Sequence, residues 1–164
     1  MKKIFVTVGA QLPFDRLIHF LDNNEYLKKF EVFAQIGNGN YKPKNINYVD
    51  FLDDKKYKEL VNNSDILISH AGMGTIISSM DYNKPLIVLP RLSKFNEHRN
   101  DHQIDTVKLF GNRDNKNDLL RVCSDTVDII EAVRKIANEP LKMSALYSPK
   151  SDGLVKYMVS RVAS

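Results

Sequence analysis

The sequence predicts an α/β protein with a Rossmann-like fold, in which a mostly parallel sheet carries helices on both faces. Short, wholly apolar segments alternate along the chain with segments whose apolar residues recur at helical spacing. The apolar segments lack polar alternation, which is typical of parallel strands buried on both faces. The 164 residues, 43% of them hydrophobic, amount to one domain that can bury its own core.

The elements can be assigned in order along the chain. Strands are expected at residues 4–8, 30–36, 46–51, 66–68 and 85–89, and helices at 14–21, 54–62, 75–82, 102–110 and 126–138. Pro13 is expected at an early position of the first helix, where its missing amide is tolerated. Asp53 is expected to cap the second helix. Residues 117–123 fit a helical turn followed by a short edge strand, and 154–162 form a last amphipathic segment.

Composition and charge exclude several classes of protein. The net charge of +4 is mild, and Lys and Arg are scattered among Asp and Asn rather than gathered in a stripe, so no nucleic-acid partner is expected. The single cysteine, Cys123, excludes a disulfide framework and a multi-cysteine zinc site. No run of about 18 apolar residues is present, and the apolar segment at 4–8 is too short for a signal peptide. We therefore expect a cytoplasmic domain.

Ligands of parallel α/β sheets bind beyond the carboxyl ends of the strands, so three loops are of interest. In the first, Gly9 follows the first strand and precedes a helix, which suits either an anion site or a plain tight turn. The second, residues 69–75, places Gly72 and Gly74 just before a helix, where bare amides and the helix dipole favour a phosphate or diphosphate. The dinucleotide fingerprint is not met, because Ile77 stands at its third glycine position, and no P-loop lysine is present.

Histidines in these loops leave alternatives open. His70 in the second loop is either a catalytic group or a hydrogen-bonded structural histidine. In the third loop, residues 90–103, His98, Asp101 and His102 could share a metal, but the H-E-x-x-H pattern is missing. A polar wall is the better interpretation. There, Arg91 or Arg99 would meet a phosphate or a sugar carboxylate, and the last two residues of the loop would meet ribose or base.

Taken together, these loops resemble a known family. The matching segments are residues 5–17, 64–65, 68–77, 84–91 and 97–103. They are similar to the C-terminal, donor-binding half of GT-B glycosyltransferases of family 28. Within that family the chain resembles the small stand-alone subunits of two-component enzymes of capsular and exopolysaccharide synthesis. Their eukaryotic relative is the catalytic subunit of the two-part N-acetylglucosaminyltransferase that extends dolichol-linked sugars.

The resemblance implies roles for individual residues. The implied donor-binding residues are Gly9, Ala10, Gln11, Phe51, His70, Gly72, Met73, Gly74, Thr75, Arg91, His102 and Gln103. Among them, Phe51 would lie near the uracil, and residues 72–75 would cradle the diphosphate. Glu97 and His98 are the candidate catalytic residues, unless the base lies on a partner. Many relatives have a ribose-binding Glu where this chain has Ser78, and Asp81 is the nearest acid.

The resemblance also implies an activity and a partner. The chain would be the UDP-sugar-dependent subunit of an inverting glycosyltransferase, transferring galactose or glucuronate to a lipid-linked saccharide. A membrane-anchored subunit would bind the acceptor and hold the chain at the inner face of the membrane. No cofactor or metal is expected, because the loops lack a D-x-D carboxylate pair. Residues 1–148 would form the donor domain, and 149–164 a helical tail that docks on the partner or on its own domain.

Three alternatives remain at this point. The chain could be a non-catalytic donor-binding module that is active only in the complex, or its donor could be UDP-N-acetylglucosamine. An unrelated nucleotide enzyme such as a dehydrogenase half is disfavoured by the missing third glycine and by the lack of an acid at the ribose-binding spacing. Self-association is left open.

Overall fold

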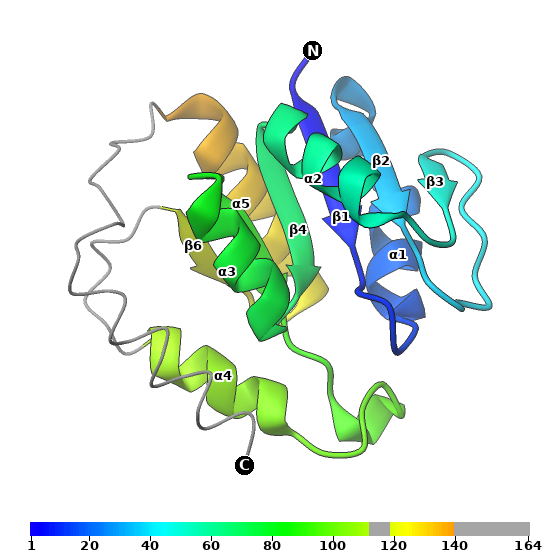
Figure 1. Ribbon diagram of the computed structural model, residues 1–164, viewed down its shortest axis with the longest axis vertical. Coiled ribbons are helices and arrows are strands. Elements are labelled where there is room, and N and C mark those ends of the chain that lie inside the picture. Colours follow the sequence, from blue (N-terminus) through cyan, green and yellow to red (C-terminus); the bar gives the residue numbers. More distant parts are fainter. Residues whose placement is uncertain (112–118, 140–164) are drawn as a thin grey trace.

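The computed structural model describes residues 1–111 and 119–139, and these form a parallel sheet between two layers of helices (Figure 1). Its strands are β1 (Lys3–Thr7), β2 (Glu31–Gln35), β3 (Asn47–Val49), β4 (Ile66–His70), β5 (Leu86–Leu89) and β6 (Leu120–Val122). They are ordered β3-β2-β1-β4-β5-β6, and every neighbouring pair is parallel. The order reverses direction beside β1, which is the arrangement of a Rossmann fold. The predicted fold class is confirmed.

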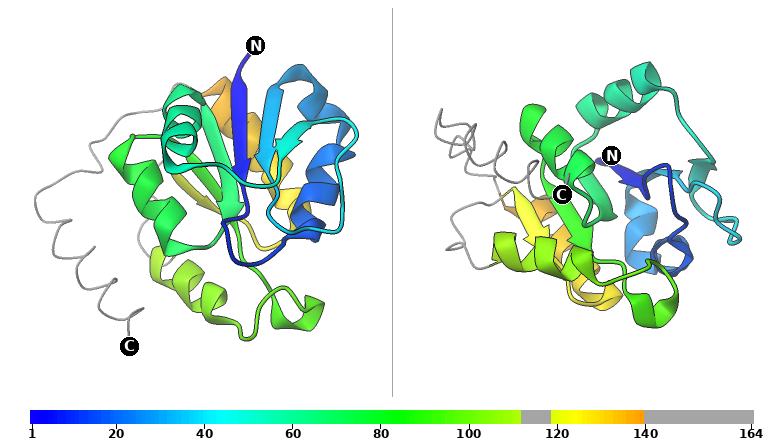
Figure 2. Two further views of the ribbon diagram at one scale, coloured as in Figure 1. Left: turned by 45° about the vertical axis from the view of Figure 1, so that its right-hand side comes forward. Right: turned by 60° about the horizontal axis from the view of Figure 1, so that its bottom comes forward.

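The helices cover both faces of the sheet. They are α1 (Asp15–Asp22), α2 (Asp54–Asn63), α3 (Met73–Asp81), α4 (His102–Gly111) and α5 (Thr126–Asn138), with short 3₁₀ turns η1 (Glu25–Lys29) and η2 (Ser93–Phe95). Helices α1 and α5 lie on one face, and α2 and α3 on the other (Figure 1). Helix α4 lies beyond the carboxyl ends of the strands (Figure 2).

Strand β1 explains why two cores form. Ile4 and Val6 point to one face and pack with the apolar sides of α1 and α5, whereas Phe5 points to the other and packs with Val61 of α2 and Ile76 of α3. All five side chains are at most 2% exposed. Each such burial stabilises the fold by about 1.5–3 kcal/mol, so the wholly apolar strands drive the layered arrangement.

Local signals fix where the helices begin. The Asp53 side chain accepts from the Lys56 amide at 2.7 Å, so the predicted cap of α2 is confirmed. Helix α5 starts with a capping box between Asp125 and Asp128, which was not among the predicted caps. Helix α1 begins at residue 15 with Phe14 at the cap, so Pro13 precedes the helix instead of standing inside it.

The end of the chain is described only in part. The edge strand expected within 117–123 is confirmed as β6, whereas the helical turn before it falls largely outside the described residues. The amphipathic segment 154–162 and the proposed division at residue 148 also lie outside them. Within the described ranges, no helix is long and apolar enough to cross a membrane.

Candidate functional site

A pocket of about 500 Å³ opens at the carboxyl end of the sheet, on the face covered by α2 and α3. Strands β1, β2 and β4, the loop after β1, and both helices contribute to it. Its lining residues are Thr7, Gly9, Ala10, Gln35, Leu52, Asp54, Tyr57, His70, Gly74, Thr75 and Ser78. The first two predicted loops therefore meet at one pocket, in the position where parallel α/β sheets bind ligands.

The N-terminus of α3 faces this pocket. The helix begins after Gly72, and no side chain caps it. Gly74 and Thr75, in its first turn, line the pocket. The first amides of a helix have no partner within the helix and carry its positive dipole end, so an anion in the pocket would be stabilised there.

His70 lies between two glycines. A Cβ atom added to Gly9 would stand 3.0 Å from the His70 Nε2 atom, and one added to Gly72 would stand 2.1 Å from Cε1. Gly9 also has a φ of +77°, which glycine adopts readily. Both glycines are therefore needed for the imidazole to occupy this position, which the pattern of the loop did not reveal.

The electrostatic surroundings keep His70 uncharged. Burial lowers the pKa of His70 to about 3, and the positive charge of Arg91 acts in the same direction. The Gln103 Nε2 atom lies 3.1 Å from His70 Nδ1. A neutral imidazole at pH 7 can donate or accept one hydrogen bond at the pocket, but it supplies no positive charge.

Polar side chains of β2, α2 and α3 also line the pocket. Burial raises the pKa of the Tyr57 phenol, and hydrogen bonds with Thr75 and Ser78 partly offset that effect. Thr75 is joined in turn to Ser69 at 3.4 Å between the two hydroxyl oxygens. Gln35 is 5% exposed, and its buried Oε1 accepts no hydrogen bond from the residues that the structure describes. An unpaired buried acceptor beside a pocket is a candidate contact for a ligand donor.

The predicted phosphate contact of Arg91 requires a correction. The side chain was expected to meet a phosphate, but Arg91 is 3% exposed and does not line the pocket. Its Nη2 atom donates to the carbonyl oxygens of Val8, at 2.7 Å, and of Leu12. Burial lowers the pKa of Arg91 to about 10, against the opposing charge of Glu97, so it stays a cation at neutral pH. Arg91 therefore supports the loop after β1 from behind.

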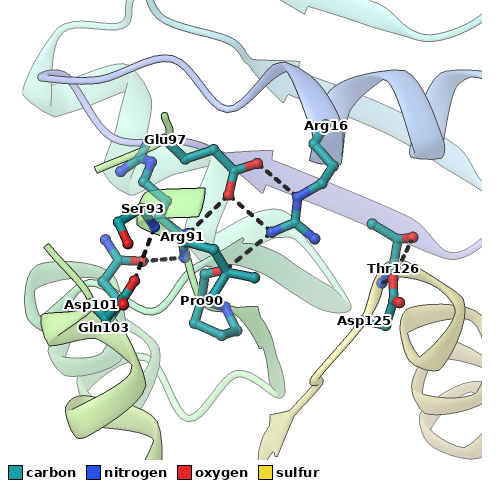
Figure 3. Close-up of polar contacts among 10 residues, drawn as sticks. Arg16, Pro90, Arg91, Ser93, Glu97, Asp101, Gln103, Asp125 and Thr126 are labelled. Atoms are coloured by element: carbon teal, nitrogen blue, oxygen red, sulfur yellow. Dashed lines mark hydrogen bonds and ion pairs between the residues drawn. The ribbon is translucent and has the colours of Figure 1, made fainter. Parts of the chain in front are cut away.

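Glu97, one of the two candidate catalytic residues, lies in an ion pair. Its carboxylate forms a two-point ion pair with Arg16 of α1, at 2.7 and 3.0 Å, and accepts from the Leu92 amide at 3.0 Å (Figure 3). The side chain is 8% exposed. Glu97 therefore joins α1 to the third loop.

The remaining predicted residues are not among those that line this pocket. Phe51 is 47% exposed, and the next residue, Leu52, is the one that lines the pocket. His102 projects into solvent, and Gln103 is buried with both polar ends bonded inside the protein. The other predicted residues outside the lining are Gln11, Gly72, Met73 and His98.

The structure adds lining residues that were not predicted from the sequence. Thr7 and Gln35 reach the pocket because they are paired in register at the ends of β1 and β2. Tyr57 and Asp54 reach it from the start of α2. Of the two candidates for the ribose position, Ser78 lines the pocket, whereas Asp81 is exposed and does not.

The alternative of a metal site finds no support in the geometry. Within residues 1–111 and 119–139, no group of three or more His, Cys, Asp or Glu side chains is close enough to hold a metal ion. His98 instead accepts from the Asn100 amide at 3.4 Å, and Asp101 accepts from the Ser93 amide at 2.9 Å (Figure 3).

Sequence comparison places the chain in a known family. The glycosyltransferase family 28 C-terminal domain matches residues 3–156. The UDP-N-acetylglucosamine transferase subunit ALG13 of Homo sapiens is 35% identical over 110 residues, which cover 60% of this chain and 10% of that protein. The Mus musculus protein of the same name is 34% identical over 110 residues, covering 60% and 9%. The matched segment thus spans about a tenth of the length of these relatives.

Solved structures agree on the fold. A solution structure of ALG13 has a TM-score of 0.64 and 22% identity, and the match covers 94% of both chains. MurG of Acinetobacter baumannii has a TM-score of 0.57 and 17% identity, with 84% of this chain and 42% of that one covered. The family model matches most of the length of this chain. The chain therefore belongs to the glycosyltransferase family 28 C-terminal domains.

Proposed function

We propose that the chain binds a UDP-sugar and serves as the donor half of an inverting glycosyltransferase. The observation that carries the proposal is the shared opening of the uncapped α3 N-terminus and the His70 imidazole into one pocket. Fixed amides and a neutral ring there suit a diphosphate, which becomes the leaving group when the sugar is transferred. The buried cation of Arg91 behind the neighbouring loop adds to the favourable potential.

The polar wall of the same pocket suits the nucleoside. Gln35 offers an amide with an unpaired acceptor, and an amide can meet the donor and acceptor edge of a uracil. Leu52 and Tyr57 supply apolar surface, and Ser78 supplies a hydroxyl. In this proposal, ribose is held without the carboxylate that stands at the position of Ser78 in many relatives.

The base and the acceptor are proposed to come from a second protein. Glu97 is held in its ion pair, which supports a chain that binds the donor and turns over only in a complex. The relatives are named as transferase subunits, in keeping with such an arrangement. The partner would be membrane-anchored and would present the hydroxyl of a lipid-linked saccharide, holding this chain at the cytoplasmic face. In the same proposal, the transfer is a step of surface-polysaccharide synthesis.

We propose that the transferred sugar is galactose, glucuronate or N-acetylglucosamine. Galactose and glucuronate follow from the resemblance to two-component enzymes, and N-acetylglucosamine is supported by the names of the relatives. Competition among the three UDP-sugars for the pocket would rank them. No metal is included in the proposal, so chelation with EDTA should leave UDP affinity unchanged, and a requirement for Mg²⁺ would contradict it.

Titration calorimetry tests the proposal directly. UDP should bind about tenfold more tightly than ADP, because a pocket that pairs with one base leaves its polar groups unpaired with the other. Equal affinities would reject the nucleotide assignment. A transfer assay with and without membranes that contain the partner then shows whether the chain is active alone or only in a complex. Sustained turnover by the isolated chain would reject the dependence on a partner.

A further inference from the structure

Gln103 connects the third loop to the ring of His70, and the direction of both its hydrogen bonds can be deduced. Its Oε1 atom lies 2.9 Å from the backbone nitrogen of Arg91. A backbone N–H can only donate, so the amide oxygen must face Arg91 and the amide nitrogen must face His70. That nitrogen lies 3.1 Å from Nδ1 of the imidazole.

This orientation determines the tautomer of His70. An amide nitrogen can only donate, so Nδ1 must accept and carry no proton. The neutral imidazole then carries its proton on Nε2. The Nε2 atom is the ring nitrogen nearest to the position that a Cβ atom on Gly9 would take, and Gly9 lines the pocket. The proton is therefore available on the side of the ring that a ligand beside Gly9 would contact.

We propose that Gln103 is a positioning residue that holds His70 as the Nε2–H tautomer, so that the ring donates a hydrogen bond to the phosphate of the bound nucleotide. This inference rests on the proposed function for its ligand, but the tautomer itself does not depend on any ligand. It also differs from the role that the family resemblance implies for Gln103, which is direct contact with nucleotide or sugar.

The packing supports a positioning role. Gln103 is 7% exposed, and the ring is confined on two sides by Gly9 and Gly72. Arg91, whose amide orients Gln103, is itself anchored to the Val8 carbonyl at 2.7 Å. A single chain of contacts thus runs from the loop after β1, through Arg91 and Gln103, to the imidazole.

The replacement Gln103→Glu tests the proposal with almost no change in volume. A carboxylate still accepts from the Arg91 amide, but it cannot donate to Nδ1, so His70 should move its proton to Nδ1 and leave Nε2 without one. The matched control is Asn100→Asp, which adds the same negative charge to the same loop at an exposed position. Both proteins keep their full length.

Two measurements at pH 8 decide the outcome. Long-range ¹H–¹⁵N spectra of the histidine rings should show the Nε2–H form of His70 in the wild type and the Nδ1–H form in Gln103→Glu, with the signal assigned by its loss in His70→Asn. UDP affinity by calorimetry should fall about tenfold to a hundredfold in Gln103→Glu, as expected for a lost hydrogen bond to a charged group. Asn100→Asp should stay within about twofold of wild type.

Several results would overturn the proposal. A wild-type His70 protonated on Nδ1 contradicts it without any variant, so the test survives if Gln103→Glu fails to fold. In that case Gln103→Met should show a mixture of both tautomers, and a single Nε2–H form there counts against the role of Gln103. A switched tautomer with UDP affinity equal to that of Asn100→Asp also rejects it. If wild type shows the Nε2–H form but binds no UDP, the proposed function fails separately.

Discussion

The Arg16 guanidinium and the Glu97 carboxylate form a two-point ion pair that joins α1 to the loop after β5, with N–O distances of 2.7 and 3.0 Å (Figure 3). Arg16 also donates to the Pro90 carbonyl at 3.2 Å, and Glu97 accepts from the Leu92 amide. The pair therefore holds α1 against the loop after β5, although the two segments are distant in sequence.

Removing Arg16 should cost stability. Arg16→Met leaves a carboxylate that is only 8% exposed without its partner, so the free energy of unfolding should fall by about 2 kcal/mol. Urea denaturation measures this change. Lys58→Met, which breaks an exposed pair with Asp54, is the control and should cost less than about 0.5 kcal/mol. Equal effects of the two replacements would show that the Arg16 pair contributes no more than a surface contact.

The two glycines around Met73 should respond oppositely to alanine. A Cβ at Gly72 would lie 2.1 Å from the His70 ring, so Gly72→Ala should lower stability by about 1–3 kcal/mol. A Cβ at Gly74 meets nothing within 4 Å, so Gly74→Ala should raise stability by about 0.5–1 kcal/mol through better helix propensity. Thermal unfolding of both variants checks this difference.

Ligand binding adds a second readout for Gly74→Ala. The new methyl group would project from the first turn of α3, which lines the pocket. UDP affinity should therefore fall even as the protein becomes more stable. A variant that is more stable and binds UDP as tightly as wild type would place the diphosphate away from this turn.

Asp22 should give part of the stability a dependence on pH. Burial acts to raise the pKa of this carboxyl, but hydrogen bonds from Tyr41 and the amides of Lys44, Asn45 and Ile46 outweigh it and hold the pKa below the usual value. The stabilisation is present above the pKa of the unfolded chain, about 3.9, and is lost as pH falls through the lower folded value.

Asp22→Asn tests that contribution. The free energy of unfolding at pH 7 should fall by about 2 kcal/mol, and its decline between pH 5 and 3 should become shallower. Asp50→Asn, at an exposed carboxylate paired with Lys42, serves as the control and should change neither quantity appreciably. Parallel acid limbs for Asp22→Asn and wild type would show that the hydrogen bonds to Asp22 do not depend on its charge.

Cys123 should be unreactive in the folded protein. It is 2% exposed, and burial, together with the charge of Asp128, raises the pKa of its thiol to about 12. Because thiolate is the reacting form, labelling by a disulfide reagent at pH 8 should occur only on unfolding and should follow the urea transition. Rapid labelling in the absence of urea would contradict the burial of this strand end.

The fold could be predicted from the sequence because parallel strands buried on both faces are wholly apolar, and here they alternate with segments whose apolar residues recur at helical spacing. The strand that ends at Gly9 and the glycine-rich turn before α3 also identified the edge where the pocket lies. The residues that the prediction missed, Thr7, Gln35 and Tyr57, reach the pocket through strand register and helix placement. Neither leaves a trace in local sequence.

The roles of the charged residues in the third loop were difficult to predict for a different reason. Arg91 and Glu97 belong to a polar loop that suggested ligand contacts, yet each is bonded inside the protein. Their partners, Val8 and Arg16, lie more than seventy positions away along the chain. Sequence can show that a loop is rich in charges, but it does not show which of those charges are already paired.

An NMR titration of the labelled protein with UDP tests the central claim most directly, because it reports where the nucleotide binds. We expect the largest amide shift changes at Gly9, Gly74 and Thr75, around the pocket between α2 and α3. Changes concentrated instead around His19 and Tyr41, which line a separate open pocket beside α1, or no changes at saturating UDP, would contradict it.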